Sequence, residues 1–382
     1  MDQSSIDPLQ GKSAGQDQFN LEAFFREGLA QALGTKAQLN VMLAGRVGVG
    51  KSTLVNAIFG EQIAETGVGP SITQTIQRYS RPDTPIAVYD TPGIELGVEA
   101  DLLAKTYLTE IRAQLGEDDT RIHFCLYCVR ARDERFETVE AEVIKALAKD
   151  VLVALVLTQC PTAEDPRASK FAQYLDSLAL PVLDEKCFMT LAEEDKVAGV
   201  RLAPFGLADL VSSIYHQLPD AQRHTLASYQ RVSLELKVAE ARRHVNFSMG
   251  TAALIAATPI PLIDSIPLSA LQIGMLGQIT TIMGFKANPK AVATAFAAVL
   301  GVASAARTTA SFFKIFPGIG RTINATIAST TTKALGEAFI TACTKVRQRQ
   351  MAGETIHEED IVSELLKELP SLVKGLLAKT AI

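Results

Sequence analysis

The motif that most constrains the fold of this chain is "GRVGVGKS", which runs from Gly45 to Ser52. It matches G-x-x-x-x-G-K-S, follows a short apolar run and opens a helical pattern, which is the context of a phosphate-binding P-loop. The glycines let successive backbone N–H groups turn toward one point, and the helix adds its positive N-terminal end. We expect Lys51 to reach the β- and γ-phosphates of a nucleotide, and the Ser52 hydroxyl to ligate Mg²⁺. The alternative is a flexible glycine turn between a strand and a helix.

A second motif, "AVYDTPG", ends at Gly93. Asp90 closes an apolar, strand-like run, and an aspartate in that place can hold the Mg²⁺ shell. We expect the backbone N–H of Gly93 to sense the γ-phosphate. Between the two motifs lies "GVGPSITQTIQRY", in which Thr73 is the first candidate and Thr75 the second for completing the Mg²⁺ shell. The alternative is an ordinary threonine at the start of a strand.

Short apolar runs alternate with helical patterns over roughly residues 39–218, which predicts an α/β domain with a mostly parallel sheet. The expected strands are "LNVMLAG", "PIAVYD", "IHFCLYCV", "VLVALVLT" and "KCFMTLA". Helical patterns cover Ser52–Phe59, Glu137–Lys149, Arg167–Leu178 and Gly206–Gln217. We expect a disordered polar tail over residues 1–19, the α/β domain with an N-terminal helix over 20–222, and an all-α hydrophobic domain over 223–382.

Composition excludes several classes of function. The net charge of -5 gives no reason to expect a nucleic-acid partner. The first residues have no apolar core of the kind a signal peptide needs, and five cysteines fit a reducing compartment, so we expect a cytoplasmic protein. Cys125 and Cys128 form a C-x-x-C within a strand-like run. Residues three apart on a strand face opposite sides, so we interpret both as core cysteines and not as a metal site.

Four segments carry a resemblance to a known family: "GRVGVGKSTLVNAIFG", "DTPG", "LVLTQ" and "GLADLVSSIYHQLPDA". Over residues 38–222 the chain resembles Era-like GTPases of the translation-factor-related class. The resemblance implies a Ras-like domain that binds GTP or GDP with Mg²⁺ and changes its loops between the two states. Together with the motifs it assigns nucleotide contacts to Gly45, Arg46, Val47, Gly48, Val49, Gly50, Lys51, Ser52, Thr53, Asp90, Thr158, Gln159 and Ala192, metal contacts to Ser52, Thr73 and Asp90, and catalytic roles to Lys51, Thr73 and Gly93.

The chain departs from the family in two places near the phosphates. Gly48 stands where Era-like P-loops usually have an asparagine that helps to hold potassium, so potassium-stimulated hydrolysis is not expected. Ile94 follows "DTPG" at the position where a water-orienting glutamine would stand, so we expect slow intrinsic turnover.

The third departure concerns the base. The family motif [N/T]-[K/Q]-x-D ends in an aspartate that accepts hydrogen bonds from guanine, but Pro161 occupies that place in "TQCP". Thr158 and Gln159 fit the first two positions. Glu164 or Asp165 would have to supply a displaced acceptor, unless these are ordinary loop acids. A backbone N–H in Thr190–Ala192 is a further candidate for binding guanine. We expect GTP to be preferred over ATP, with equal binding of both as the open alternative.

Residues 246–285 resemble the hydrophobic domain attached to some Era-like GTPases. The segment that carries this resemblance is "TPIPLIDSIPLSALQIGMLGQITTIMGF". Prolines interrupt the apolar stretches, which are too short or too polar for an ordinary membrane-spanning helix. A helical hairpin that dips into one leaflet over residues 246–333 is one interpretation, with Lys286, Lys290 and Arg307 facing anionic lipid. A buried helical bundle is the other. Asp264 is expected to cap the helix that begins near Ser265.

These observations predict a regulatory GTPase whose nucleotide state controls a helical domain, at the cytoplasmic face of a membrane, with an unknown protein effector or activator. The main alternative is a soluble nucleotide-gated scaffold with negligible hydrolysis and relaxed base specificity. A nucleotide-dependent dimer is compatible with either. A dynamin-like membrane remodeller is a third hypothesis, but the sequence shows no long heptad stalk.

Overall fold

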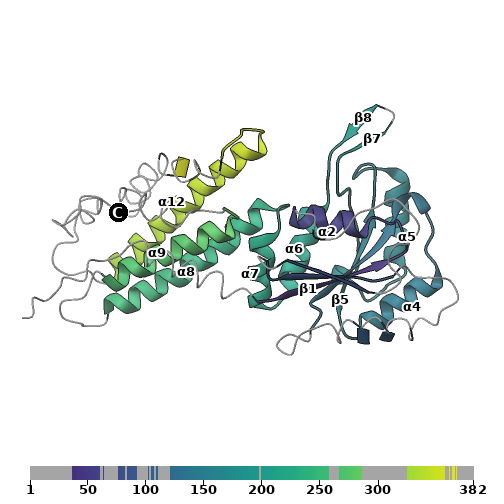
Figure 1. Cartoon of the computed structure of the whole chain (residues 1–382), viewed down its shortest axis with the longest axis horizontal. Coiled ribbons are helices and arrows are strands. Elements are labelled where there is room, and N and C mark those ends of the chain that lie inside the picture. The colour runs from purple at the N-terminus through teal and green to yellow at the C-terminus, as the bar shows by residue number, and fades with distance from the viewer. Residues whose placement is uncertain are drawn as a thin grey trace, which may run out of the picture.

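The computed structural model describes residues 37–60, 63, 76–81, 84–92, 102, 105–106, 109–110, 121–197, 199–257, 266–285, 325–357, 361, 364–365 and 367. Over these residues the chain forms an α/β domain and an elongated group of helices that extends away from it (Figure 1).

A six-stranded sheet forms the centre of the α/β domain, in the order β2-β3-β1-β4-β5-β6. The strands are β1 (Leu39–Gly45), β2 (Gln77–Ser80), β3 (Ile86–Asp90), β4 (Phe124–Arg130), β5 (Leu152–Thr158) and β6 (Cys187–Met189). All neighbours pair in parallel except β2 and β3. Strands β2 and β3 lie on one side of β1, and β4, β5 and β6 lie on the other, so the strand order reverses at β1. In open α/β sheets, ligands bind at such a switch point. The predicted Ras-like fold with a mostly parallel sheet is therefore confirmed.

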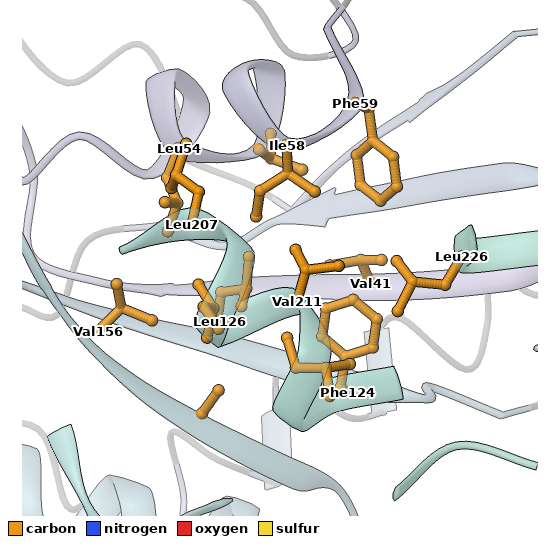
Figure 2. Packing of buried hydrophobic residues seen from close by; sticks show 14 of the residues in the cluster. Val41, Leu54, Ile58, Phe59, Phe124, Leu126, Val156, Leu207, Val211 and Leu226 are labelled. Carbon is orange, nitrogen blue, oxygen red and sulfur yellow. The ribbon is translucent and has the colours of Figure 1, made fainter. Parts of the chain in front are cut away.

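Helices cover both faces of this sheet. Helices α2 (Lys51–Phe59), α6 (Leu207–Gln217) and α7 (Asp220–Tyr229) bury apolar side chains on one face, and α4 (Thr138–Leu147) and α5 (Pro166–Ser177) cover the other. Figure 2 shows Ile58 and Phe59 of α2 facing Val41 of β1. Cys125 belongs to the core under α4 and α5, whereas Cys128 belongs to the core under α2. The interpretation of this pair as core cysteines on opposite faces is thus confirmed.

Two parts of the α/β domain have no counterpart in the predicted elements. Strand β2 is a short, polar, half-exposed edge strand, so it lacks the apolar run on which strand prediction depends. A two-stranded hairpin, β7 (Asp195–Val197) and β8 (Val200–Leu202), lies between β6 and α6 and projects from the domain (Figure 1). Short 3₁₀ turns, η1 (Ala131–Asp133) and η2 (Leu183–Glu185), complete the domain as described.

The second part of the chain is helical. Helices α8 (Leu234–Ala257), α9 (Ile266–Ile282) and α12 (Ala325–Met351) lie side by side (Figure 1). Gly336 permits a close approach, because a Cβ there would lie 2.5 Å from a methyl carbon of Val245 on α8. The buried Gln272 donates to the hydroxyl of Thr332 at 3.0 Å, which fixes α9 against α12. The expected boundary after residue 222 lies inside α7.

A buried lysine joins the helical part to the α/β domain. Lys237 on α8 donates from Nζ to the carbonyl oxygens of Ala227 (3.0 Å) and Ser228 (2.7 Å) near the end of α7, and to that of Ile282 (3.0 Å) at the end of α9. The last carbonyls of a helix have no partner within it, and a cation near them is also favoured by the helix dipole. One side chain therefore satisfies the ends of two helices at the junction.

Within the described ranges, no helix is both long enough and apolar enough to cross a bilayer. Asp264, Lys286, Lys290 and Arg307 lie outside those ranges, so their expected roles are not tested. Membrane contact through residues 246–333 stays a prediction.

Candidate functional site: a P-loop at the sheet's switch point

The loop between β1 and α2 has the backbone shape that the motif predicts. Gly45, Gly48 and Gly50 adopt positive φ angles of 125°, 75° and 91°. Gly45 also has no room for a side chain, because a Cβ would lie 2.2 Å from the carbonyl oxygen of Cys128 on the neighbouring strand. Gly50 is the N-cap of α2, and therefore the orphan N–H groups of the first helical turn open onto the loop. Of the other loop residues, Val47 is exposed and Val49 is buried.

Lys51, the first residue of α2, folds back over this loop. Its side chain is buried, and Nζ donates to the carbonyl oxygens of Gly45 and Arg46, each at 3.2 Å. These contacts hold the ammonium group above the loop, where it can meet an anion that the backbone N–H groups surround. Ser52 and Thr53, both half-buried, follow in the first turn of the helix.

Asp90 lies beside this site because β3 pairs with β1, with Leu43 opposite Asp90 in the register. The next residue fixes the chain: the backbone N–H and the hydroxyl of Thr91 donate to the Leu43 carbonyl at 3.1 and 2.8 Å. Burial raises the pKa of the Asp90 carboxyl, and the charge of Lys51 opposes this rise. Its Oδ1 atom is buried and makes no hydrogen bond within the described part of the chain. A buried carboxylate oxygen of this kind is suited to a cation shell.

Thr158 and Gln159 lie against the P-loop, as the resemblance implies. The Thr158 hydroxyl donates to the carbonyl oxygens of Val49 (2.5 Å) and Val129 (3.1 Å), which ties the end of β5 to the loop. Gln159 adopts a positive φ of 56°, and its Nε2 lies 3.4 Å from the position that a Cβ on Gly50 would occupy. The amide of Gln159 thus lies beside the last glycine of the loop.

The residues after Gln159 are committed to other contacts. The N–H of the buried Cys160 donates to the Thr190 carbonyl at 3.0 Å. The Asp165 carboxylate caps α5 by accepting from the N–H groups of Arg167 (3.1 Å) and Ala168 (2.8 Å). The Oδ1 atom of Asp165 thus serves the first turn of α5, and the suggestion that this carboxylate supplies a displaced guanine acceptor stays a prediction. Glu164 is exposed in the same loop.

The loop after β6 brings Ala192 near this edge of the sheet. Leu191 exchanges backbone hydrogen bonds with Phe205, each at 3.1 Å, and the N–H of Thr190 donates to the Leu157 carbonyl at 2.8 Å. Among the three candidates for a backbone donor to guanine, Thr190 and Leu191 therefore already use their N–H groups. Ala192 follows them as a half-buried residue. Thr73, Thr75, Gly93 and Ile94 lie outside the described residues, so their expected roles stay predictions.

Sequence reasoning missed an ion pair that anchors the P-loop. Arg46 lies 2.9 Å from a carboxylate oxygen of the buried Glu140 and 3.5 Å from one of Glu137, both at the start of α4. Glu140 also accepts from the N–H of Glu137 at 2.9 Å in a capping box. The available signal was Glu140 just before an apolar helical run, because an acid in the first helical turn is the N3 residue of a capping box. A basic loop residue was the natural partner for it.

The comparisons with known proteins agree with this geometry. Residues 40–159 match the family described as 50S ribosome-binding GTPase, and the match spans the P-loop and Asp90 and ends at Gln159. Over this segment the chain is similar to the P-loop GTPase domains of that family. Two finer assignments stay predictions: the Era-like subclass, and the resemblance of the helical part to the hydrophobic domain attached to some Era-like GTPases.

Several relatives share the GTPase domain. Septin-12 of Rattus norvegicus is 24% identical over 197 residues, which cover 44% of this chain and 55% of the septin. GTP-binding protein A of Dictyostelium discoideum is 29% identical over 174 residues, covering 45% of this chain and 35% of that protein. The chain thus spans about half the length of these relatives or less.

Among solved structures, Toc33 from Arabidopsis thaliana in complex with GDP and Mg²⁺ is 19% identical and gives a TM-score of 0.33, covering 54% of this chain and 96% of Toc33. Aquifex aeolicus Era bound to GDP and AlF₄⁻ is 17% identical and gives a TM-score of 0.34, covering 58% of this chain and 69% of Era.

Proposed function

We propose that this chain binds GTP or GDP with Mg²⁺, hydrolyses GTP, and uses the nucleotide state to control its helical part. The observation that carries the proposal is the position of Lys51, whose ammonium group is held over a glycine loop by two carbonyls and lies close enough to Asp90 to affect its pKa. A buried cation beside a ring of backbone N–H groups is a built site for a polyphosphate.

The residues present fit a nucleotide with its metal ion. The backbone of residues 46–51 and the Lys51 ammonium would surround the phosphates, while the Ser52 hydroxyl and Asp90 would hold the Mg²⁺ shell. The buried Asp90 oxygen without a hydrogen bond among the described residues supports the second assignment. The bound ion would neutralise charge on the phosphate oxygens, and the role of this chain is to position the nucleotide.

The path from the nucleotide site to the helical part runs through α2. This helix begins at Lys51, and near its other end the Ile58 carbonyl accepts from the N–H of Arg231 at 2.8 Å. Arg231 lies in the turn between α7 and α8, which Gln230 organises through bonds to Val232 and Ser233. A shift of α2 would therefore act directly on the start of α8. This chain of contacts from α2 to the turn before α8 supports coupling between the nucleotide site and the helical part. A structural difference between the GTP and GDP states, measured in α8, would demonstrate that coupling.

The helical part would pass the signal to a lipid bilayer or a protein effector. Phe247 and Leu254, seven residues apart on α8, are 74% and 71% exposed. Their spacing places them on one side of the helix, which supports contact with an apolar partner. Co-sedimentation of the full chain with anionic vesicles distinguishes the two partners: a chain that stays in the supernatant argues against lipid.

A second candidate function is a nucleotide-gated scaffold with relaxed base specificity. It is favoured by the loop after Gln159, where Pro161 offers no acceptor and Asp165 caps α5. Without an acceptor from this loop, guanine would be distinguished by Gln159 and by the backbone near Ala192.

Competition of GTP and ATP against a fluorescent guanine nucleotide, on the full chain with Mg²⁺, decides between the two candidates. We expect GTP to displace the probe at about 5-fold lower concentration than ATP, because one remaining hydrogen bond to guanine contributes about 1 kcal/mol. Equal displacement by both nucleotides would support the scaffold. Inosine triphosphate, which keeps the base O6 but lacks the 2-amino group, is the matched control: it should compete nearly as well as GTP if the backbone contact to O6 carries the preference.

A further inference from the structure

A cluster of polar side chains lies at the junction of the α/β domain with the helical part. His224 comes from α7, and Glu240 and His244 come from one side of α8, four residues apart. Glu240 is 1% exposed, His224 is buried, and His244 is half-buried. A buried carboxylate together with two imidazoles is unusual at an interface between helices.

Three potential ligand atoms of this cluster converge. Nδ1 of His224 lies 3.1 Å from Nε2 of His244 and 3.3 Å from Oε1 of Glu240, and His244 Nε2 lies 3.5 Å from the same Oε1. The ligands of a tetrahedral zinc ion with bonds of about 2.0–2.1 Å lie about 3.3 Å apart. The observed triangle therefore has the dimensions of one face of such a site.

Hydrogen bonds alone do not satisfy all three contacts. Each neutral imidazole carries one proton. If both rings donate to Glu240, their two N–H groups face each other across 3.1 Å; if His244 donates to His224, a nitrogen lone pair faces the carboxylate oxygen. A cation at the centre would accept all three lone pairs at once.

The surroundings orient the carboxylate for this role. The Tyr215 hydroxyl donates to Oε2 of Glu240 at 2.6 Å, which leaves Oε1 for the cluster. A hydrogen bond to the outer oxygen of a ligating carboxylate orients that ligand and tunes metal affinity.

The other charges that face the cluster are largely balanced. Arg243 lies 3.9 Å from Oε2 of Glu240, but it also pairs with Asp220 at 2.9 Å. Arg223 pairs with the same aspartate at 3.3 Å and lies over the ring of Tyr215. Both arginines contact the cluster from the Oε2 and Tyr215 side of the carboxylate.

We propose that His224, Glu240 and His244 form a binding site for a divalent transition-metal ion of the zinc type. The ligand atoms are Nδ1, Oε1 and Nε2, and the fourth position opens beside the half-buried His244, where water completes the shell. The ion would clamp α7 of the GTPase domain to α8 of the helical part. This site is separate from the Mg²⁺ site, which uses hard oxygen ligands at the P-loop.

The test is titration of the chelator-treated full chain with Co²⁺, with GDP and excess Mg²⁺ present to occupy the P-loop. We expect one equivalent to bind with the intense visible absorption of tetrahedral cobalt, and Zn²⁺ to displace it. Glu240→Gln and His244→Gln should each weaken binding at least 10-fold. His357→Gln, at an exposed histidine beyond α12, is the matched control and should bind like the wild type.

A second readout separates loss of ligands from loss of the fold. Zn²⁺ should raise the melting temperature of the wild type and of His357→Gln, because an ion that binds only the folded state stabilises it. It should not do so for His244→Gln, whose half-buried side chain can be replaced without opening the core. The proposal is overturned if the wild type gains no tetrahedral cobalt, or if both ligand variants bind as it does.

Discussion

We expect Lys51→Ala to weaken binding of GDP and GTP about 100-fold, because a charge-assisted contact to phosphate contributes about 1.5–3 kcal/mol. The loop carbonyls of Gly45 and Arg46 hold the buried ammonium group of Lys51 in place, and alanine removes this group entirely. Equilibrium titration with a fluorescent guanine nucleotide measures the effect.

The matched control is Lys145→Ala, which removes a lysine on the exposed face of α4. It changes the net charge by the same amount and should leave affinity unchanged. Wild-type affinity in Lys51→Ala would remove the assignment of the phosphate site, whatever else the protein binds.

Gly45→Ala should be the most destabilising single change in the P-loop. A Cβ at this position would lie 2.2 Å from the Cys128 carbonyl oxygen, a backbone atom held within β4, and the φ of 125° is itself unfavourable for alanine. We expect a cost of about 3 kcal/mol or more. Thermal melting should show a decrease of roughly 6–12 °C for a domain of this size.

Gly48→Ala provides the comparison within the same loop. Gly48 also has a positive φ, of 75°, but nothing lies within 4 Å of the position its Cβ would take. The cost should be limited to the backbone, about 1–2 kcal/mol. Equal melting temperatures for the two variants would contradict the close approach of β1 and β4 at Gly45.

The buried strands and the P-loop were predictable because their signals are local. The run "LNVMLAG" became β1 with the same bounds, and the expected helix at Ser52–Phe59 differs from α2 by one residue. Apolar runs bounded by turn residues fix such elements without help from distant contacts. The edge strand β2 and the hairpin at 195–202 were missed because their residues are polar and their pairing is decided by neighbours.

The candidate site divides in the same way. The two motifs were expected to lie together, and Lys51 and Asp90 do lie close enough for the charge of Lys51 to act on the Asp90 carboxyl. The sequence alone could not show that Asp165 caps α5, because a loop acid can equally cap a helix or accept a hydrogen bond from a base. Contacts between segments far apart in the chain, such as Arg46 with Glu140, depend on the sheet order and the register, which set the distances.

Single-turnover phosphate release from GTP, on the purified full chain with Mg²⁺, tests the central claim most directly. We predict slow release, on the order of 10⁻⁴ s⁻¹, since the chain positions the phosphates but shows no glutamine after "DTPG". Lys51→Ala should release none above the rate of GTP in buffer. Binding of GTP without any release by the wild type would contradict the account and identify the chain as a nucleotide-gated scaffold.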